Sequence, residues 1–211
     1  VVGDVAWTTL QTDEEIVLAR YDLTDSTVRE SVTDPVTSDL LPAGMPWYLE
    51  ATATEAVPEG CGSSYMSYEA AAHRLWLGTF STSTGADVCV VEITDDGSLG
   101  DRVEQWSLPI DNVQGILALP DGSALLTQSY GDADSALYLW TPGDESATQV
   151  LSGPAGMEDL ALSPEGLVWT ASESGARYFQ KRSDENLLCY TNWTDLYPYA
   201  FALDPTSFLG D

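Results

Sequence analysis

Clusters of polar side chains stand directly before the recurring apolar phrases of this sequence, and their types suit the binding of metal ions or sugars. They carry carboxyl, amide, hydroxyl or phenol groups: Ser63, Ser64, Asp111, Asn112, Gln114, Glu158, Asp159, Tyr197 and Tyr199. Carboxylate and amide oxygens are ligands of hard cations, and convergent polar groups orient bound ligands. We expect six of these residues to form one binding site: Ser64, Asn112, Gln114, Glu158, Asp159 and Tyr199. The alternative is that these side chains are simply hydrated.

Other patterns of catalytic residues are weak in this chain. His73 is the one histidine, so a Ser-His-Asp triad would need it, and it stands in an expected turn. A catalytic pair of carboxylates would use Glu158 and Glu173, for which solvated or hydrogen-bonded roles are favoured. Asp132 and Asp134 lack the terminal glutamate of a twelve-residue calcium loop, which favours an ordinary hairpin turn over a shared calcium ion.

An apolar phrase with a central turn recurs along the chain and must position these polar groups. It reads ILALPDGSALLTQS at 116–129 and LALSPEGLVWTASES at 160–174, and its first half returns as FALDP at 201–205. A degenerate copy, in which Ala-Ala-His replaces the turn, is SYMSYEAAAHRLWLGTFS at 64–81. Short apolar runs bounded by turn residues are typical of β-strands, so each complete copy predicts a hairpin.

The spacing of these copies predicts a repeated sheet. Ala118, Ala161 and Ala202 mark the copies and are 43 and 41 residues apart. A repeat in the low forties that holds four short strands is typical of a β-propeller blade, which needs neighbouring blades to cover both of its faces. We therefore expect an all-β protein, a single domain over residues 1–211, built as a propeller of four to five four-stranded blades.

The two ends of the chain are expected to pair and close the ring. The last copy stops after its first strand, and VAWTTLQTDEEIVLARYDLTDSTVRESV near the N-terminus reads as the later strands of a blade. Their pairing would remove two exposed sheet edges. With four blades, residues 35–62 are an insertion, whereas a distorted blade there makes five. The chain starts on VVGDVAWTTL without a Met, which favours a processed or clipped form of a longer protein.

The phrases LALPDGSALLTQS and LALSPEGLVWTASES resemble blades of the NHL-type and gluconolactonase-type propellers, over roughly residues 111–205. Such propellers host hydrolases, lyases, sugar binders and scaffolds. The gluconolactonase-type enzymes hold a metal ion in the central channel on acidic and amide side chains. The resemblance therefore implies a candidate calcium site, with the ion as a Lewis acid, on Asp111, Asn112 and Glu158.

Two classes of function are compatible with these features. The first is an exported, non-enzymatic module that binds a protein or carbohydrate partner, or assembles with itself or a second chain. It would use the channel mouth or one face of the ring. The second is a calcium-assisted hydrolase or lyase with its site at the channel mouth. The lack of a recognisable catalytic set in the sequence favours the first.

The charge of the chain narrows the choice of partners and compartment. Asp and Glu number 34 against 7 Lys and Arg, which gives a net charge of −27. Such a surface repels phosphate backbones and anionic headgroups, so nucleic acid and acidic membranes are disfavoured. No apolar run approaches the roughly 20 residues of a membrane-spanning helix, so no membrane insertion is expected. We expect an extracellular or secreted protein.

The cysteines and a glycosylation sequon agree with export. Cys61 and Cys89 fall in one predicted blade and are expected to form a disulfide, which leaves Cys189 as a buried thiol. Asn192 begins the acceptor sequence Asn-Trp-Thr.

The tryptophans divide into core and surface candidates. Trp76, Trp140 and Trp169 are expected to pack between blades, because aromatic residues in strands serve the core more often than they bind sugars. Trp193 and the Tyr-Pro-Tyr run at 197–199 are the candidates for an exposed binding platform.

Overall fold

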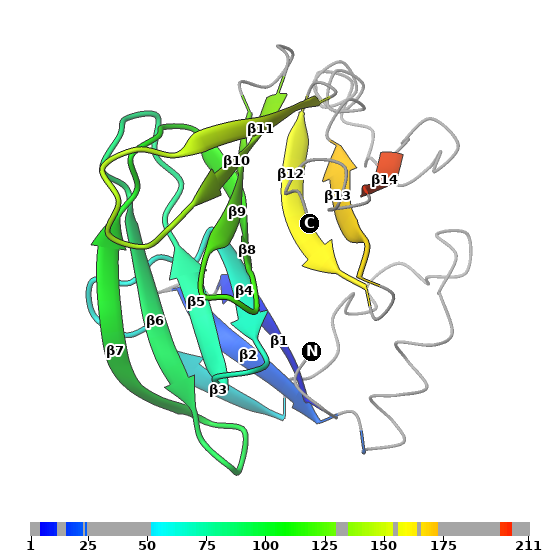
Figure 1. The fold of residues 1–211 in the computed structure, drawn as a ribbon. Coiled ribbons are helices and arrows are strands. Elements are labelled where there is room, and N and C mark those ends of the chain that lie inside the picture. The colour runs from blue at the N-terminus through cyan, green and yellow to red at the C-terminus, as the bar shows by residue number, and fades with distance from the viewer. Residues whose placement is uncertain are drawn as a thin grey trace, which may run out of the picture.

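The computed structural model confirms an all-β protein (Figure 1). It describes residues 5–11, 16–22, 24, 52–129, 135–153, 156–163, 166–172 and 199–203. These residues form fourteen strands in four antiparallel sheets. The described part of the chain contains no helix able to cross a membrane.

The first two sheets follow each other along the chain. The first sheet has the order β1 (Val5–Gln11), β2 (Ile16–Asp22) and β3 (Ala53–Ala56). The second sheet has the order β4 (Tyr65–Glu69), β5 (Arg74–Gly78), β6 (Asp87–Ile93) and β7 (Leu99–Ser107).

The other two sheets continue in the same manner. The third sheet has the order β8 (Val113–Ala118), β9 (Ala124–Gln128), β10 (Ser135–Trp140) and β11 (Thr148–Gly153). The fourth sheet has the order β12 (Met157–Leu162), β13 (Val168–Ser172) and β14 (Tyr199–Leu203). Strand β8 contacts both β4 and β12, so the first strands of these sheets lie side by side at the inner edge (Figure 1). We call β4, β8 and β12 the inner strands.

The repeated phrase forms the inner hairpins β4–β5, β8–β9 and β12–β13, as the sequence predicts. In the two copies with a Pro-x-Gly turn, the glycine makes the same backbone hydrogen bond. The amide of Gly122 donates to the Leu119 carbonyl, and that of Gly166 donates to the Ser163 carbonyl. Both glycines have φ near +85°, a conformation that costs glycine little and other residues more.

Each inner hairpin presents one cross-strand pair to the sheet that follows it in the chain. Ser67 lies opposite Trp76 in the second sheet, and Leu117 lies opposite Leu125 in the third. Trp76 packs in a core cluster with residues of β8 and β9, and the two leucines pack with residues of β12 and β13. The pair at the matching place in the fourth sheet is Ala161 and Trp169.

Three apolar clusters join the four sheets in order. One cluster joins Leu18 of the first sheet to strands β5 and β6. A second joins the second and third sheets, and a third joins the third and fourth sheets. Burial of each large apolar side chain stabilises the fold by about 1.5–3 kcal/mol, so these interfaces hold the sheets together.

Tilted and edge-to-face contacts between tryptophan rings reinforce the interface between the second and third sheets. The ring centroids of Trp76 and Trp106 are 5.5 Å apart, and those of Trp106 and Trp140 are 6.2 Å apart at an interplanar angle of 83°. The predicted burial of Trp76 and Trp140 is confirmed, since they are 3% and 1% exposed. The same prediction is wrong for Trp169, which is 41% exposed, because no described residue covers that face of the fourth sheet.

Hydrogen bonds also cross between sheets. The amide of Ala118 donates to Ser67 Oγ at 3.0 Å, and the amide of Met157 donates to Ser135 Oγ at 3.0 Å. Thr127 Oγ1 donates to the Glu158 carbonyl at 2.7 Å. Each bond satisfies a buried polar group, which would otherwise cost about 1–3 kcal/mol.

The C-terminal strand departs from the sequence-based expectation. Strand β14 pairs with β13, with Ala202 opposite Trp169, and so forms the third strand of the fourth sheet. It was expected to begin a further blade and to pair with the N-terminal strand, but β1 pairs with β2, and no pairing of β14 with β1 is found among the described residues. An apolar strand such as β14 can add to the free edge of β13 or to that of β1, because the unpaired backbone N–H and C=O groups are the same at both edges.

The disulfide between Cys61 and Cys89 is confirmed. Their Cα atoms are 5.4 Å apart, and the bond joins the segment before β4 to the third strand of the same sheet. The 28-residue separation corresponds to a stabilisation of about 3–4 kcal/mol from the loss of unfolded-state entropy. Cys189 lies outside the described residues.

Close packing of β8 on β12 predicts that Gly115→Ala is strongly destabilising. A Cβ at residue 115 would lie 2.6 Å from Asp159 Cα and 2.8 Å from the Glu158 carbonyl oxygen, so the backbones would have to separate. We expect a loss of about 3 kcal/mol in the free energy of unfolding, measured by urea denaturation.

Gly100→Ala is the matched control for that measurement. A Cβ at residue 100 meets the Glu92 Cβ at 3.1 Å and the Glu92 carbonyl oxygen at 3.4 Å, so β6 and β7 have to separate by only a few tenths of an ångström. We expect a change of about 0.5 kcal/mol or less. Equal losses for the two variants would contradict the close approach of β8 and β12.

Candidate functional site

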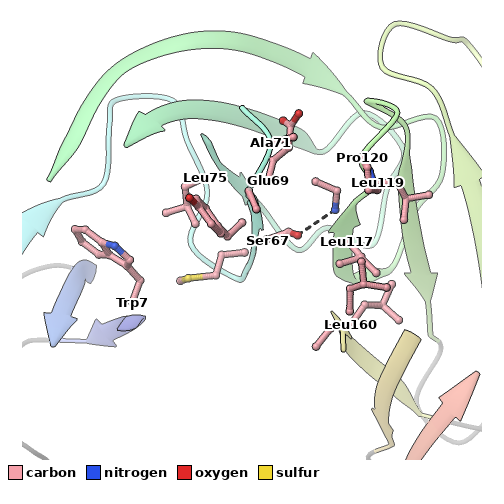
Figure 2. A pocket seen from close by; sticks show the side chains of 15 residues that line it. Trp7, Ser67, Glu69, Ala71, Leu75, Leu117, Leu119, Pro120 and Leu160 are labelled. Atoms are coloured by element: carbon pink, nitrogen blue, oxygen red, sulfur yellow. Dashed lines mark hydrogen bonds between the residues drawn. The ribbon is translucent and has the colours of Figure 1, made fainter. Parts of the chain in front are cut away.

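A pocket of about 400 Å³ lies where the inner strands end. Its lining comes from most of β4, from the C-terminal halves of β8 and β12, from the turns that follow β4 and β8, from Leu75 of β5 and from Trp7 of β1. Figure 2 shows the Trp7 ring on one side of the pocket and Leu117 and Leu160 on the other. Four sheets therefore contribute to one cavity.

Local sequence explains why the inner strands end at this pocket. Asp121 in the β8–β9 turn accepts hydrogen bonds from the Ser123 hydroxyl at 2.6 Å and the Ser123 amide at 3.0 Å. These bonds hold the pKa of the Asp121 carboxyl below its usual value of 3.8. The β4–β5 turn ends instead at His73, with φ of +53°, and His73 Nδ1 lies 3.3 Å from the Tyr68 hydroxyl.

The walls of the pocket are mainly apolar. Its aliphatic side chains include those of Met66, Leu75, Leu117 and Leu160, and Trp7 adds an aromatic ring. Most known ligand pockets have this character, with volumes of about 300–1,000 Å³ and a few polar groups. The cavity therefore has the size and chemistry of a small-ligand site.

Several polar side chains of the lining are engaged within the protein, whereas the indole N–H of Trp7 is buried without a hydrogen-bond partner. Ser67 Oγ accepts the Ala118 amide, and Glu69 Oε2 accepts the indole N–H of Trp76 at 3.0 Å. Tyr68 pairs with His73. These bonds fix the walls of the pocket before any ligand arrives.

The sequence-predicted site residues lie elsewhere on the inner strands. Ser64 and Asn112 precede β4 and β8, and Gln114 lies near the start of β8, whereas the pocket is at the other ends of these strands. Ser64 Oγ accepts a hydrogen bond from the backbone amide of Phe80 at 3.0 Å, and the backbone amide of Asn112 donates to the Ser81 carbonyl at 2.8 Å.

The remaining predicted site residues lie on β12 and β14 or outside the described residues. Glu158 and Asp159 lie in the first half of β12, against β8. Tyr199 lies on β14, which is not an inner strand. Several candidates fall outside the described residues: Asp132, Asp134, Glu173, Asn192, Trp193 and Tyr197.

Asp159 is the described carboxyl group with the most altered pKa. Burial raises its pKa from 3.8 to about 6, although hydrogen bonds from the amides of Leu160 and Ile116 act in the opposite direction. Asp159 packs against Gly115 of β8, and its side chain is partly exposed to solvent. Tyr65 lies close by, and burial together with the Asp159 charge raises its pKa.

The calcium site implied by the resemblance stays a prediction. Among the described residues, no group of three or more Asp, Glu, His or Cys side chains is placed to hold a metal ion. Asp111 Oδ1 accepts a hydrogen bond from Gln128 Nε2 at 2.8 Å. This bond ties the predicted ligand to the end of β9, within the third sheet.

The sequence does not single out the residues that line the pocket. Trp7 belongs to no motif, and Met66, Ser67, Leu117 and Leu160 stand out only as parts of the repeated phrases. The repeated phrase could have indicated these residues, because the residues directly before each turn must lie at one common end of the inner strands. Periodicity does not tell which end of the strands is hollow.

No model of a known protein family and no curated protein matches this chain. What the pocket binds must therefore be argued from the chemistry of its own lining.

The raised pKa of Asp159 predicts a specific dependence of stability on pH. The folded state binds the proton more tightly than the unfolded state, so stability is lost as pH rises from about 4 to about 6. Asp159→Asn removes this loss while keeping an oxygen acceptor. We expect the melting temperature of the variant, relative to the parent, to increase between pH 4 and pH 7, as measured by circular dichroism.

Asp121→Asn is the control of opposite sign. The pKa of Asp121 is lowered, so its carboxylate contributes stability that is present above about pH 4 and is lost as pH falls. This variant should be less stable than the parent at pH 7 and should approach it in acid. A pH-independent effect of Asp159→Asn would contradict the assigned shift.

Proposed function

We propose that this chain is an exported binding module and that its ligand occupies the pocket at the ends of the inner strands. The observation that carries the proposal is the convergence of four sheets on one largely apolar cavity of about 400 Å³. Cavities of this size and character are the usual sites of small ligands. The Cys61–Cys89 disulfide supports an oxidising, extracellular setting.

The rigidity of the frame also supports a binding role. The inner strands are tied to one another by the Ala118–Ser67 hydrogen bond and by the apolar clusters between sheets. A pocket held in this way does not have to be ordered when the ligand arrives. Less free energy is then lost on binding, which favours affinity.

Filling the pocket tests the proposal. Ala71 lines the pocket and is exposed, so Ala71→Trp places a large ring in the cavity without disturbing the core. The uncharged fluorescent probe N-phenyl-1-naphthylamine should bind the parent, and the variant should bind it at least about tenfold more weakly.

Ala56→Trp is the matched control, since Ala56 is exposed on β3 and does not line the pocket. It should bind the probe as the parent does. No binding of the probe by the parent, or equal binding by all three proteins, would remove the pocket as a ligand site.

We also propose that the four sheets are blades of a propeller that closes into a ring, the architecture that the resemblance to NHL-type and gluconolactonase-type blades implies. Three sheets support this proposal, because each has a cross-strand pair at the same position of its inner hairpin. The pairs are Ser67–Trp76, Leu117–Leu125 and Ala161–Trp169. In the first two pairs this position is covered by the next sheet.

A further inference from the structure

We propose that the pocket binds a primary amine whose ammonium group pairs with Glu69 and whose apolar body lies against the aliphatic wall. The inference rests on the proposed function and names the class of molecule that the site takes. Three observations carry it: an open carboxylate oxygen of Glu69 in the lining, the net charge of the chain, and the apolar and aromatic side chains beside Glu69.

Glu69 has one carboxylate oxygen that is held in place and one that is open. Its Oε2 accepts a hydrogen bond from the indole N–H of Trp76 at 3.0 Å, and Trp76 is itself in the core between two sheets. Oε1 has no hydrogen-bond partner among the described residues and remains accessible to solvent. A carboxylate fixed through one oxygen loses little further freedom when the other oxygen binds a donor, which favours affinity.

The cross-strand neighbour of Glu69 does not occupy this open oxygen. Arg74 lies opposite Glu69 in the register of β4 and β5, but its guanidinium pairs with Glu104 at 3.1 Å. Within the part of the chain that the structure describes, Glu69 therefore forms no ion pair. An ammonium group that donates to Oε1 would form a charge-assisted hydrogen bond, which is roughly twice as strong as one between neutral groups.

The charge of the whole chain also favours a cation. Asp and Glu number 34 against 7 Lys and Arg, so the net charge is −27. A field of this sign raises the concentration of cations near the protein and lowers that of anions. The field thus increases the rate at which an amine reaches the pocket, and the bond to Glu69 retains the amine there.

Apolar surface beside Glu69 gives the body of the amine a place to pack. Figure 2 shows Glu69 between Trp7 on one side and Leu117 on the other. Met66 and Leu160 extend the aliphatic surface of the lining. Walls of this kind pack well on flat rings, and the face of an indole ring attracts a cation. A fused two-ring hydrocarbon that carries an aminomethyl group fits within about 400 Å³.

The indole N–H of Trp7 is a further donor in the lining, and it does not select for charge. This N–H is buried and has no hydrogen-bond partner, so a ligand reaches it only if the ring shifts. An indole N–H is a neutral donor, which an ether or hydroxyl oxygen on the body of the amine would satisfy. Glu69 is the charged side chain of the described lining and so sets the sign of charge that the pocket prefers.

The test uses three small competitors that share one ring system and differ in charge. They are 1-naphthylmethylamine, which is a cation at pH 7, 1-methylnaphthalene, which is neutral, and 1-naphthoate, which is an anion. Each is titrated against N-phenyl-1-naphthylamine bound to the full chain. We expect the amine to displace the probe at concentrations at least about threefold lower than the neutral compound and at least about tenfold lower than the anion.

Glu69→Gln removes the charge of the site and keeps an oxygen that can accept the Trp76 indole N–H. We expect competition by the amine to weaken about tenfold and competition by 1-methylnaphthalene to change by less than about twofold. Glu92→Gln is the matched control, because Glu92 is exposed on β6, does not line the pocket and loses the same charge. It should alter neither value by more than about twofold.

A second variant tests the preference without changing Glu69. Ala71 is exposed and lines the pocket, so Ala71→Lys places a competing cation at the site. This variant should weaken competition by the amine about tenfold and should leave competition by 1-methylnaphthalene within about twofold. Ala56→Lys carries the same charge away from the pocket and should alter neither value by more than about twofold.

The outcomes separate the two proposals. If the probe does not bind the parent chain, the proposed function fails. If the probe binds and Ala71→Trp weakens it, but the neutral compound or the anion competes as well as the amine, the binding site stands and the preference for amines is wrong. The preference is also wrong if Glu69→Gln weakens the amine and the neutral compound equally. Preference for the amine that is lost in Glu69→Gln and kept in Glu92→Gln supports both proposals.

Discussion

The structure depends on one constraint: a sheet with two apolar faces is covered only when other sheets pack against it. The second and third sheets each bury one face against the preceding sheet and the other against the following one. The cross-strand pairs Ser67–Trp76 and Leu117–Leu125 lie on the faces turned to the following sheet. Exclusion of water from these faces brings the inner strands together, since among the described residues the one disulfide, Cys61–Cys89, does not join one sheet to another.

The pocket is a consequence of how the inner strands converge. Near its start, β12 approaches β8 so closely at Gly115 that no side chain fits between their backbones. At their ends the same strands line an open cavity with Trp7. Asp159 lies in the crowded part, where burial raises its pKa, and the ligand site proposed here lies in the open part. One set of strands thus provides both a tightly packed region and a hollow one.

Several features were predictable because they depend on neighbouring residues. The hairpins follow from apolar runs around Pro-x-Gly turns, and the positive φ of Gly122 and Gly166 follows from the turn type. The Cys61–Cys89 pair was predictable because both residues fall in one repeat. The exposure of Trp169 was not predictable, since the sequence marks this position as equivalent to buried Leu125 but does not show what covers it.

The amino-acid sequence by itself determined the strands, their turns, the repeat and the disulfide, because these rest on side-chain alternation and backbone geometry over short distances along the chain. Tertiary structure alone decided that β14 joins β13 and that the inner strands leave a cavity at their ends. Free strand edges are chemically alike, so pairing depends on which edge is within reach. A cavity is likewise the space left by side chains from four sheets, and its place is set by their joint packing.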